Sequence, residues 1–196
     1  MSAKTDGLGG RLALADRDEL SVAQRKLFDH ISVTALQWAH RSGFAATDPD
    51  GRLIGPFNPS LLNPKLAAAF LNLQTAEQQH TSLDEQVRQV VILTVGAVWH
   101  ATYELYAHSS VARHAGLSEA VITELAGGNE PAQLTDAQTA AHRLARQLST
   151  SHGVDDSTYH DAEQIFGAAG VFDIAVLTGI YHTVCATLTA FAIPAP

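Results

Sequence analysis

The chain of 196 residues is short enough to form one domain, or one compact domain with an N-terminal extension. Its 46% hydrophobic and 16% charged residues supply enough apolar surface for a core, which argues against intrinsic disorder. The formal net charge of −8 argues against a nucleic-acid partner, because a phosphate backbone selects clusters of Lys and Arg.

The start of the chain and its cysteine content indicate the compartment. Residues 1–7 lack the long apolar run of a signal peptide. The single cysteine, Cys185, excludes an intrachain disulfide bond and a CxxC motif, and this usage is typical of a reducing compartment. We therefore expect a cytoplasmic protein.

Helix signals begin at residue 21. The capping box Ser21–Gln24 and the apolar residues that follow at helical spacing predict a helix that ends near Gly43. The segment 45–59 is rich in Gly, Pro, Asp and Asn, which predicts a long loop of the kind that often forms a functional lid. The Asn-Pro pair at 63–64 provides an N-cap and a first-turn proline for the next helix.

Three further helices are predicted in the middle of the chain. A capping box over residues 82–85 opens a helix that includes Val87 to Val98. Another helix is expected from about Ala101 to Ala115, where Gly116 stops it. Ser118 then caps a short helix.

The C-terminal third is predicted to be helical as well. The capping box at 135–138 opens a helix that ends at Gly153. Asp156 is expected to cap a helix to about Phe166, and Gly170 to precede the last helix, 171–192. No segment alternates polar and apolar residues as a strand does, so we predict an all-α bundle of about seven or eight helices.

The last predicted helix is apolar enough to resemble a membrane span. The segment 171–193 nevertheless contains Asp173, His182 and four threonines, and such groups are costly at the centre of a bilayer. We therefore predict a buried core helix and no membrane partner.

The most informative segment is 88–118, which reads RQVVILTVGAVWHATYELYAHSSVARHAGLS. It resembles the carboxymuconolactone decarboxylase and alkylhydroperoxidase-D-like family, whose core combines an R-E-x-x-I-L-x-V helix, a Y-E-W-x-x-H segment and an A-G-L-S stop. The resemblance covers about Gly55 to the C-terminus, including Tyr181. It implies an alkylhydroperoxidase-D-like fold and a homo-oligomer, a trimer or a hexamer. We expect an N-terminal helix and loop extension over residues 1–60 and the family domain over 61–196.

The chain departs from the redox branch of this family at two cysteine positions. In that branch two cysteines precede the histidine by seven and four residues, and here these positions hold Ala101 and Glu104. Neither residue can supply the thiolate that disulfide exchange requires. The acidic residue that follows the arginine in the family is Gln89 here, and an amide cannot relay a proton as a carboxylate does.

Glu104 and His108 are the candidate catalytic pair. They are four residues apart on one predicted helix, so they share a face. A carboxylate beside an imidazole raises the pKa of the histidine and orients its ring. Such a pair can act as acid and base in decarboxylation, although an ordinary structural Glu–His pair has the same spacing.

Four residues are candidates for substrate binding. Arg88 can bind a substrate carboxylate through two hydrogen bonds, or form a structural ion pair. Gln89 takes the place of the family acid, and Tyr103 matches the family motif and is expected to line the pocket. His182, on the apolar last helix, is expected either at the pocket wall or as a hydrogen-bonded structural group.

Metal and cofactor sites are not expected. His100, Glu104 and His108 follow one another at steps of four, but they lack the HExxH spacing and a further ligand. Cys185 is interpreted as a buried small hydrophobe. The remaining histidines are expected at the surface, such as His142, His152 and His160.

The sequence thus favours a carboxymuconolactone decarboxylase-like enzyme, a carbon–carbon lyase that acts on a small acidic lactone or oxo-acid without a cofactor. His108 is the expected general acid and base, and Glu104 is its partner. One alternative is a non-catalytic oligomeric binding or scaffold protein of the same fold. The other is the peroxiredoxin-type activity found in the family, which the missing cysteine pair disfavours.

Overall fold

The computed structural model describes residues 7–196. The prediction that residues 1–7 are not a signal peptide therefore falls almost wholly outside the described residues. Helix makes up 68% of the described residues, about twice the usual third. Within residues 7–196 the only β-type pairing is an isolated bridge between Thr47 and Leu53. The predicted all-α fold is therefore confirmed.

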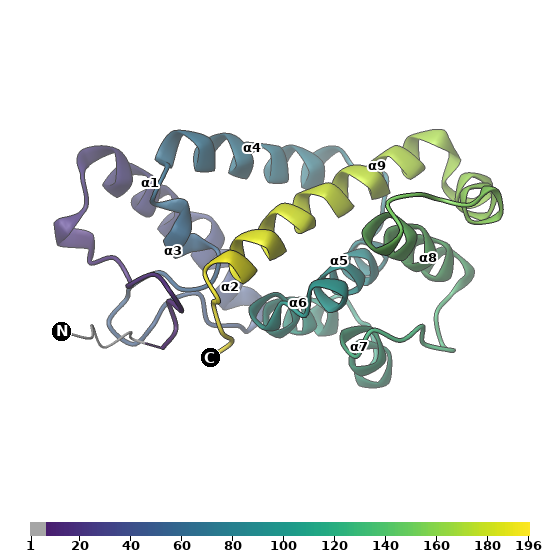
Figure 1. Ribbon diagram of the computed structural model, residues 1–196, viewed down its shortest axis with the longest axis horizontal. Coiled ribbons are helices and arrows are strands. Elements are labelled where there is room, and N and C mark those ends of the chain that lie inside the picture. The colour runs from purple at the N-terminus through teal and green to yellow at the C-terminus, as the bar shows by residue number, and fades with distance from the viewer. Residues whose placement is uncertain (1–6) are drawn as a thin grey trace.

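The helices follow one another with short connections, apart from one long loop before α3 (Figure 1). In chain order they are a 3₁₀ turn η1 (Arg17–Glu19), α1 (Val22–Val33), α2 (Ala35–Ser42), α3 (Phe57–Ser60), α4 (Pro64–His80), α5 (Glu85–Trp99), α6 (Thr102–His114), α7 (Glu119–Ala126), α8 (Asp136–Thr150) and α9 (Asp156–Ala190).

The core lies where α5, α8 and α9 pack against one another. Ile92 of α5, Leu144 of α8 and Leu177 of α9 belong to one buried cluster, which Leu14 and Ile54 from the N-terminal part also join. By length and composition α9 could cross a membrane. Its buried face in this cluster accounts for that apolar character.

The helix starts follow the predicted capping chemistry with one shift in the middle of the chain. The capping boxes at Ser21 and Thr135 are both formed. Asp84, not Ser82, caps α5, because the Asp84 carboxylate accepts the backbone N–H of Val87. Ser82 instead donates its hydroxyl to Asp173 of α9 at 2.7 Å.

Two helix breaks lie at other positions than expected. The first predicted helix divides at Thr34, whose φ and ψ of −117° and −83° are not helical, so α1 and α2 are separate. The last helix bends at Gly167, not at Gly170, since only Gly167 has a positive φ, 67°, which glycine adopts without strain. Its cap is Asp155, one residue before the expected Asp156.

The long loop before α3 is anchored to α6. Tyr103 donates its hydroxyl to the carbonyl of Ala45 at 2.8 Å, and the Ala45 N–H donates to the hydroxyl of Tyr106 at 2.9 Å. Gly55, at a φ of 62°, approaches the Tyr103 ring so closely that a Cβ there would clash with it. The loop predicted over 45–59 is therefore present but held in place, and its last residues form α3.

Candidate active site

Glu104 and His108 form a contact inside the core. They lie one turn apart on α6, and Glu104 Oε1 is 3.2 Å from His108 Nε2. Their exposed fractions are 3% and 5%, so both are withdrawn from solvent. Apart from this ring contact, Glu104 Oε1 is a buried oxygen without a hydrogen-bond partner. The predicted shared face is confirmed, and it faces inward.

The other nitrogen of His108 contacts the first turns of α5. His108 Nδ1 is 2.8 Å from Gln89 Oε1. Gln89 in turn donates its amide N–H to Glu85 Oε1 at 2.7 Å. The residue that replaces the family acid is therefore in direct contact with the candidate catalytic histidine. Glu85 was not predicted, and its position one turn before Gln89 is the only sequence signal for it.

Burial determines the protonation of the pair. It raises the pKa of Glu104 to about 8. Burial, and then the positive charge of Arg88, lowers the pKa of His108 to about 3. The expectation that the carboxylate raises the pKa of His108 is wrong, because neither charged form is favoured in an apolar environment. At neutral pH the pair is thus an uncharged carboxylic acid beside an uncharged imidazole.

Aromatic and apolar groups enclose the pair. The Tyr181 ring packs edge-on against His108 with 5.0 Å between ring centroids, and Trp38 of α2 lies at 5.8 Å. Cys185 is fully buried, and burial and the nearby Glu104 raise the pKa of its thiol. Trp38 lies fifty residues before the segment 88–118, so no spacing rule in the sequence connects it to the pair.

With this geometry in place, comparison with known families is informative. Residues 64–147, from the start of α4 to near the end of α8, match the carboxymuconolactone decarboxylase family. Over that segment the chain is similar to this family. A comparison with curated proteins found no match.

Solved structures share the fold. An uncharacterized peroxidase-related protein from Ralstonia eutropha, described as an alkylhydroperoxidase AhpD core, has a TM-score of 0.74 at 14% identity, over 96% of this chain and 93% of that one. A peroxidase-related protein from a Silicibacter species has a TM-score of 0.73 at 16% identity, over 100% and 95%. The debrominase Bmp8 has a TM-score of 0.69 at 14% identity, over 93% and 90%. The predicted alkylhydroperoxidase-D-like fold is thereby confirmed.

Two of the family-motif candidates make structural bonds. Arg88 binds Glu77 of α4 through Nε and Nη2, at 3.2 and 2.6 Å, and binds Glu85 through Nη1 at 2.7 Å. The structure thus places Arg88 in an ion-pair network that joins α4 to α5. Tyr103 directs its hydroxyl to the carbonyl of Ala45, away from His108.

His182 lies in a separate cluster. Trp99 donates its indole N–H to His182 Nδ1 at 3.0 Å, and His182 Nε2 is 2.8 Å from the Ser149 hydroxyl. His182 therefore does not join the Glu104–His108 pair.

Two other histidines lie elsewhere, His100 at the end of α5 and His142 on α8. His100 is exposed and ends α5 with a left-handed φ of 51°, so it does not continue the face of Glu104 and His108. Over residues 7–196 no three His, Cys, Asp or Glu side chains cluster as metal ligands would. His142, predicted at the surface, is 1% exposed, because its ring lies between α8 and α5 with Nδ1 2.8 Å from the Thr94 hydroxyl of α5.

Two hollows at the described surface lie away from the pair. One lies between α8 and α9, beside Arg143 and Asp161, and another lies along α9 beside Trp99, His182 and Phe191. Glu104 and His108 line neither of these two hollows. The pair is a buried polar site within the packing of α5, α6 and α9.

The protonation of the pair predicts a specific pH dependence of stability. Glu104 has a pKa of about 8 in the folded state against an ordinary 4.5, and His108 about 3 against 6.5. Between pH 4.5 and 6.5 the folded and the unfolded state each hold one titratable proton on the pair, so the pair does not change the free energy of unfolding with pH. Between 6.5 and 8 only the folded state holds a proton, so stability falls as pH rises, by up to about 1.4 kcal/mol per pH unit.

Urea unfolding of wild type and Glu104→Gln at pH 6.5, 7.3 and 8 would measure this slope. We expect the alkaline decline in wild type and its absence in Glu104→Gln. His142, whose pKa burial lowers to about 4, changes stability only below pH 6.5 and leaves this window clear. Equal slopes in the two proteins would contradict the protonated Glu104.

Proposed function

We propose that the protein is a cofactor-independent acid–base enzyme, a carbon–carbon lyase that acts on a small acidic lactone or oxo-acid. The observation that carries this proposal is the buried Glu104–His108 pair, which holds a single proton and leaves Glu104 Oε1 without a further partner. A buried polar atom without a partner destabilises a fold, and such atoms are retained mainly where chemistry needs them.

The proposed step moves one proton. The bond between the substrate carbon and its carboxylate breaks, carbon dioxide leaves, and the electron pair moves onto the adjacent carbonyl as an enolate. His108 Nε2 then takes the proton of Glu104 and passes it to the substrate carbon, and solvent restores the proton on Glu104. The uncharged, apolar surroundings favour this step, since they disfavour the charge of the carboxylate more than the dispersed charge of the enolate.

The substrate is proposed to reach His108 from the side of Trp38. Trp38 is only partly buried and lies against the His108 ring, whereas Tyr181 on another side is 9% exposed. Trp38 belongs to α2, an eight-residue helix that is separated from α1 by the break at Thr34. Displacement of this short helix would open the site without disturbing α5 or α9.

The alternatives have less support. A thiol peroxidase needs an accessible, low-pKa cysteine, and the only cysteine of the chain is buried with a raised thiol pKa. A scaffold protein has no use for a buried acid and imidazole in contact, which apolar side chains could replace without loss of stability.

The test is carbon dioxide release from a panel of small lactone acids and β-oxo acids. Wild type and Cys185→Ser are expected to release carbon dioxide from the same members at rates within a few-fold. His108→Ala should release very little. No release by wild type from any member, with a folded His108→Ala protein, would favour the scaffold function.

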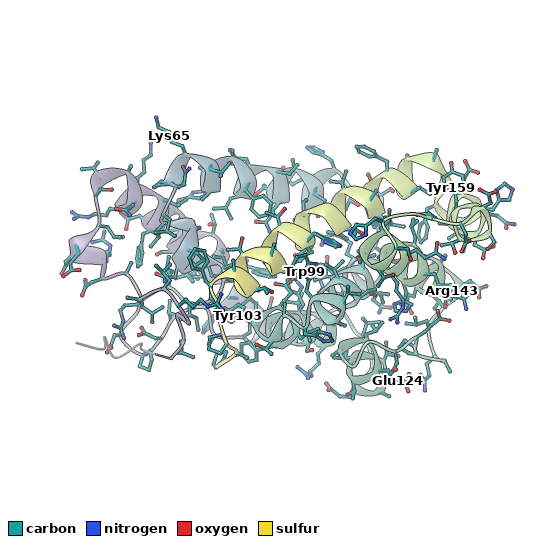
Figure 2. All side chains as sticks on the ribbon, in the orientation of Figure 1. Lys65, Trp99, Tyr103, Glu124, Arg143 and Tyr159 are labelled. Atoms are coloured by element: carbon teal, nitrogen blue, oxygen red, sulfur yellow. The ribbon has the colours of Figure 1, made fainter. Side chains whose placement is uncertain are left out.

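We also propose that the protein is a homo-oligomer, in which a second copy packs on α4. None of the apolar residues of α4 is fully buried. Leu62, Leu66 and Leu73 are 58%, 67% and 47% exposed and follow one another at helical spacing. Figure 1 shows α4 at the outside of the molecule, and in Figure 2 the neighbouring Lys65 points away from it. Exposed apolar stripes of this kind mark protein interfaces.

Charge on this stripe is expected to separate the copies. The double variant Leu66→Glu/Leu73→Glu should lower the mass measured by light scattering after size-exclusion chromatography. Val22→Glu places the same charge on α1 at a side chain that is 88% exposed, and should leave the mass unchanged. A monomeric wild type, or an unchanged mass in the double variant, would contradict the proposed interface.

A further inference from the structure

The orientation of the Gln89 amide follows from its partner Glu85. Glu85 Oε2 accepts a hydrogen bond from Arg88 at 2.7 Å, and a carboxylate in an ion pair with a guanidinium can only accept hydrogen bonds. Glu85 Oε1 lies 2.7 Å from the amide nitrogen of Gln89. The NH₂ group of Gln89 must therefore face Glu85, and its carbonyl oxygen must face the other way.

That carbonyl oxygen determines the tautomer of His108. Gln89 Oε1 cannot donate, and it lies 2.8 Å from His108 Nδ1, so Nδ1 must carry a proton. An uncharged imidazole has one N–H group, which leaves Nε2 with its lone pair. Nε2 is the nitrogen that faces Glu104 Oε1 at 3.2 Å.

We propose, building on the function proposed above, that Glu85 and Gln89 are positioning residues that hold His108 as the Nδ1–H tautomer and direct the lone pair of Nε2 at the Glu104 carboxyl. The transferable proton of the site then lies between His108 Nε2 and Glu104. With the other tautomer Nε2 would carry its own proton toward the carboxyl, and the pair could not pass a proton from Glu104 to the imidazole.

The same chain of bonds explains why residue 89 is an amide. A carboxylate at this position would lie beside the carboxylate of Glu85, at a distance where like charges repel. An amide can satisfy both neighbours, since it donates to Glu85 and accepts from His108. The amide of Gln89 thus suits the neighbouring carboxylate of Glu85, and a glutamine in place of the family's acidic residue keeps His108 in the same orientation.

The groups that face the pair do not compete for this role. Tyr181 and Cys185 on α9 have pKa values raised by burial, so both stay protonated, and Trp38 on α2 does not titrate. Arg88 on α5 acts on His108 through its positive charge and disfavours the imidazolium. The surroundings therefore keep His108 uncharged, and the α5 bonds select its tautomer.

The test is the ¹⁵N spectrum of the His108 ring in the full-length protein at pH 6, with its signals identified by their loss in His108→Gln. Wild type should show a protonated Nδ1 and an unprotonated Nε2. In Glu85→Gln the amide at 85 can donate or accept, so both tautomers should appear. Glu85→Gln/Gln89→Glu reverses donor and acceptor, and should restore the protonated Nδ1.

Glu119→Gln is the matched control. Glu119 is the first residue of α7, as Glu85 is of α5, and it pairs with Arg113 away from His108. This variant should leave the His108 signals unchanged. A wild-type His108 with the proton on Nε2, or with protons on both nitrogens, would overturn the proposal, as would an unaltered spectrum in Glu85→Gln.

Kinetics give a second readout on any substrate of the panel. Turnover scales with the fraction of the competent tautomer, so Glu85→Gln should lower kcat by about two- to tenfold with KM unchanged, and the double variant should recover it. The spectrum needs no substrate. An Nδ1–H tautomer with no lyase activity would therefore count against the proposed function alone, and activity with the wrong tautomer against the positioning role alone.

Discussion

His108→Ala is expected to lower carbon dioxide release by about 10²–10⁴-fold, the usual range for loss of a general acid–base group. The imidazole contacts both the Glu104 carboxyl and the Gln89 amide. Its removal separates the buried proton from the substrate. The measurement is kcat under saturating substrate, with the unfolding midpoint and the oligomer mass as checks that the variant is folded.

Glu104→Gln refines this expectation. The amide keeps the shape and can donate an N–H to His108 Nε2, but it holds no transferable proton. We expect a smaller loss than in His108→Ala, because His108 can still exchange protons with water. The wild-type rate should fall as pH rises through about 8, where Glu104 loses its proton, and this decline should vanish in Glu104→Gln. A His108→Ala protein that keeps more than a tenth of the wild-type rate would contradict the proposed role.

The sequence predicted the local features of the site. The shared face of Glu104 and His108 depends only on the four-residue step along a helix. The capping boxes at Ser21 and Thr135 depend only on each cap residue and the glutamine three positions after it. Such features need no tertiary information. The family motif added the fold and the position of the histidine.

The electrostatics could not be predicted in this way. Burial reverses the pKa shift expected for His108, and burial depends on α9 and α2, which lie far along the chain. His142 was placed at the surface because the polar character of a histidine does not reveal that its ring is enclosed. The link from Arg88 to Glu77 joins two helices, and no spacing rule connects them.

That link supports the second large prediction. Arg88→Met is expected to lower the free energy of unfolding by about 3–5 kcal/mol, the range for a buried ion pair that loses one partner. The side chains of Arg88 and Glu77 are 8% and 4% exposed, so the variant would leave the Glu77 carboxylate buried without its counter-charge. Urea unfolding at pH 6.5 measures the effect.

Arg113→Met is the matched control, because Arg113 also pairs with a glutamate but both side chains are more than half exposed, at 52% and 63%. Arg113→Met should therefore lose far less stability than Arg88→Met, because water already screens the exposed pair. The double variant Arg88→Met/Glu77→Leu removes the stranded carboxylate and should recover most of the stability. Equal losses in Arg88→Met and Arg113→Met would mean that Glu77 reaches water. In that case α4 would not be held against α5 by charge, and its attachment would rest on Phe70 and its other apolar contacts.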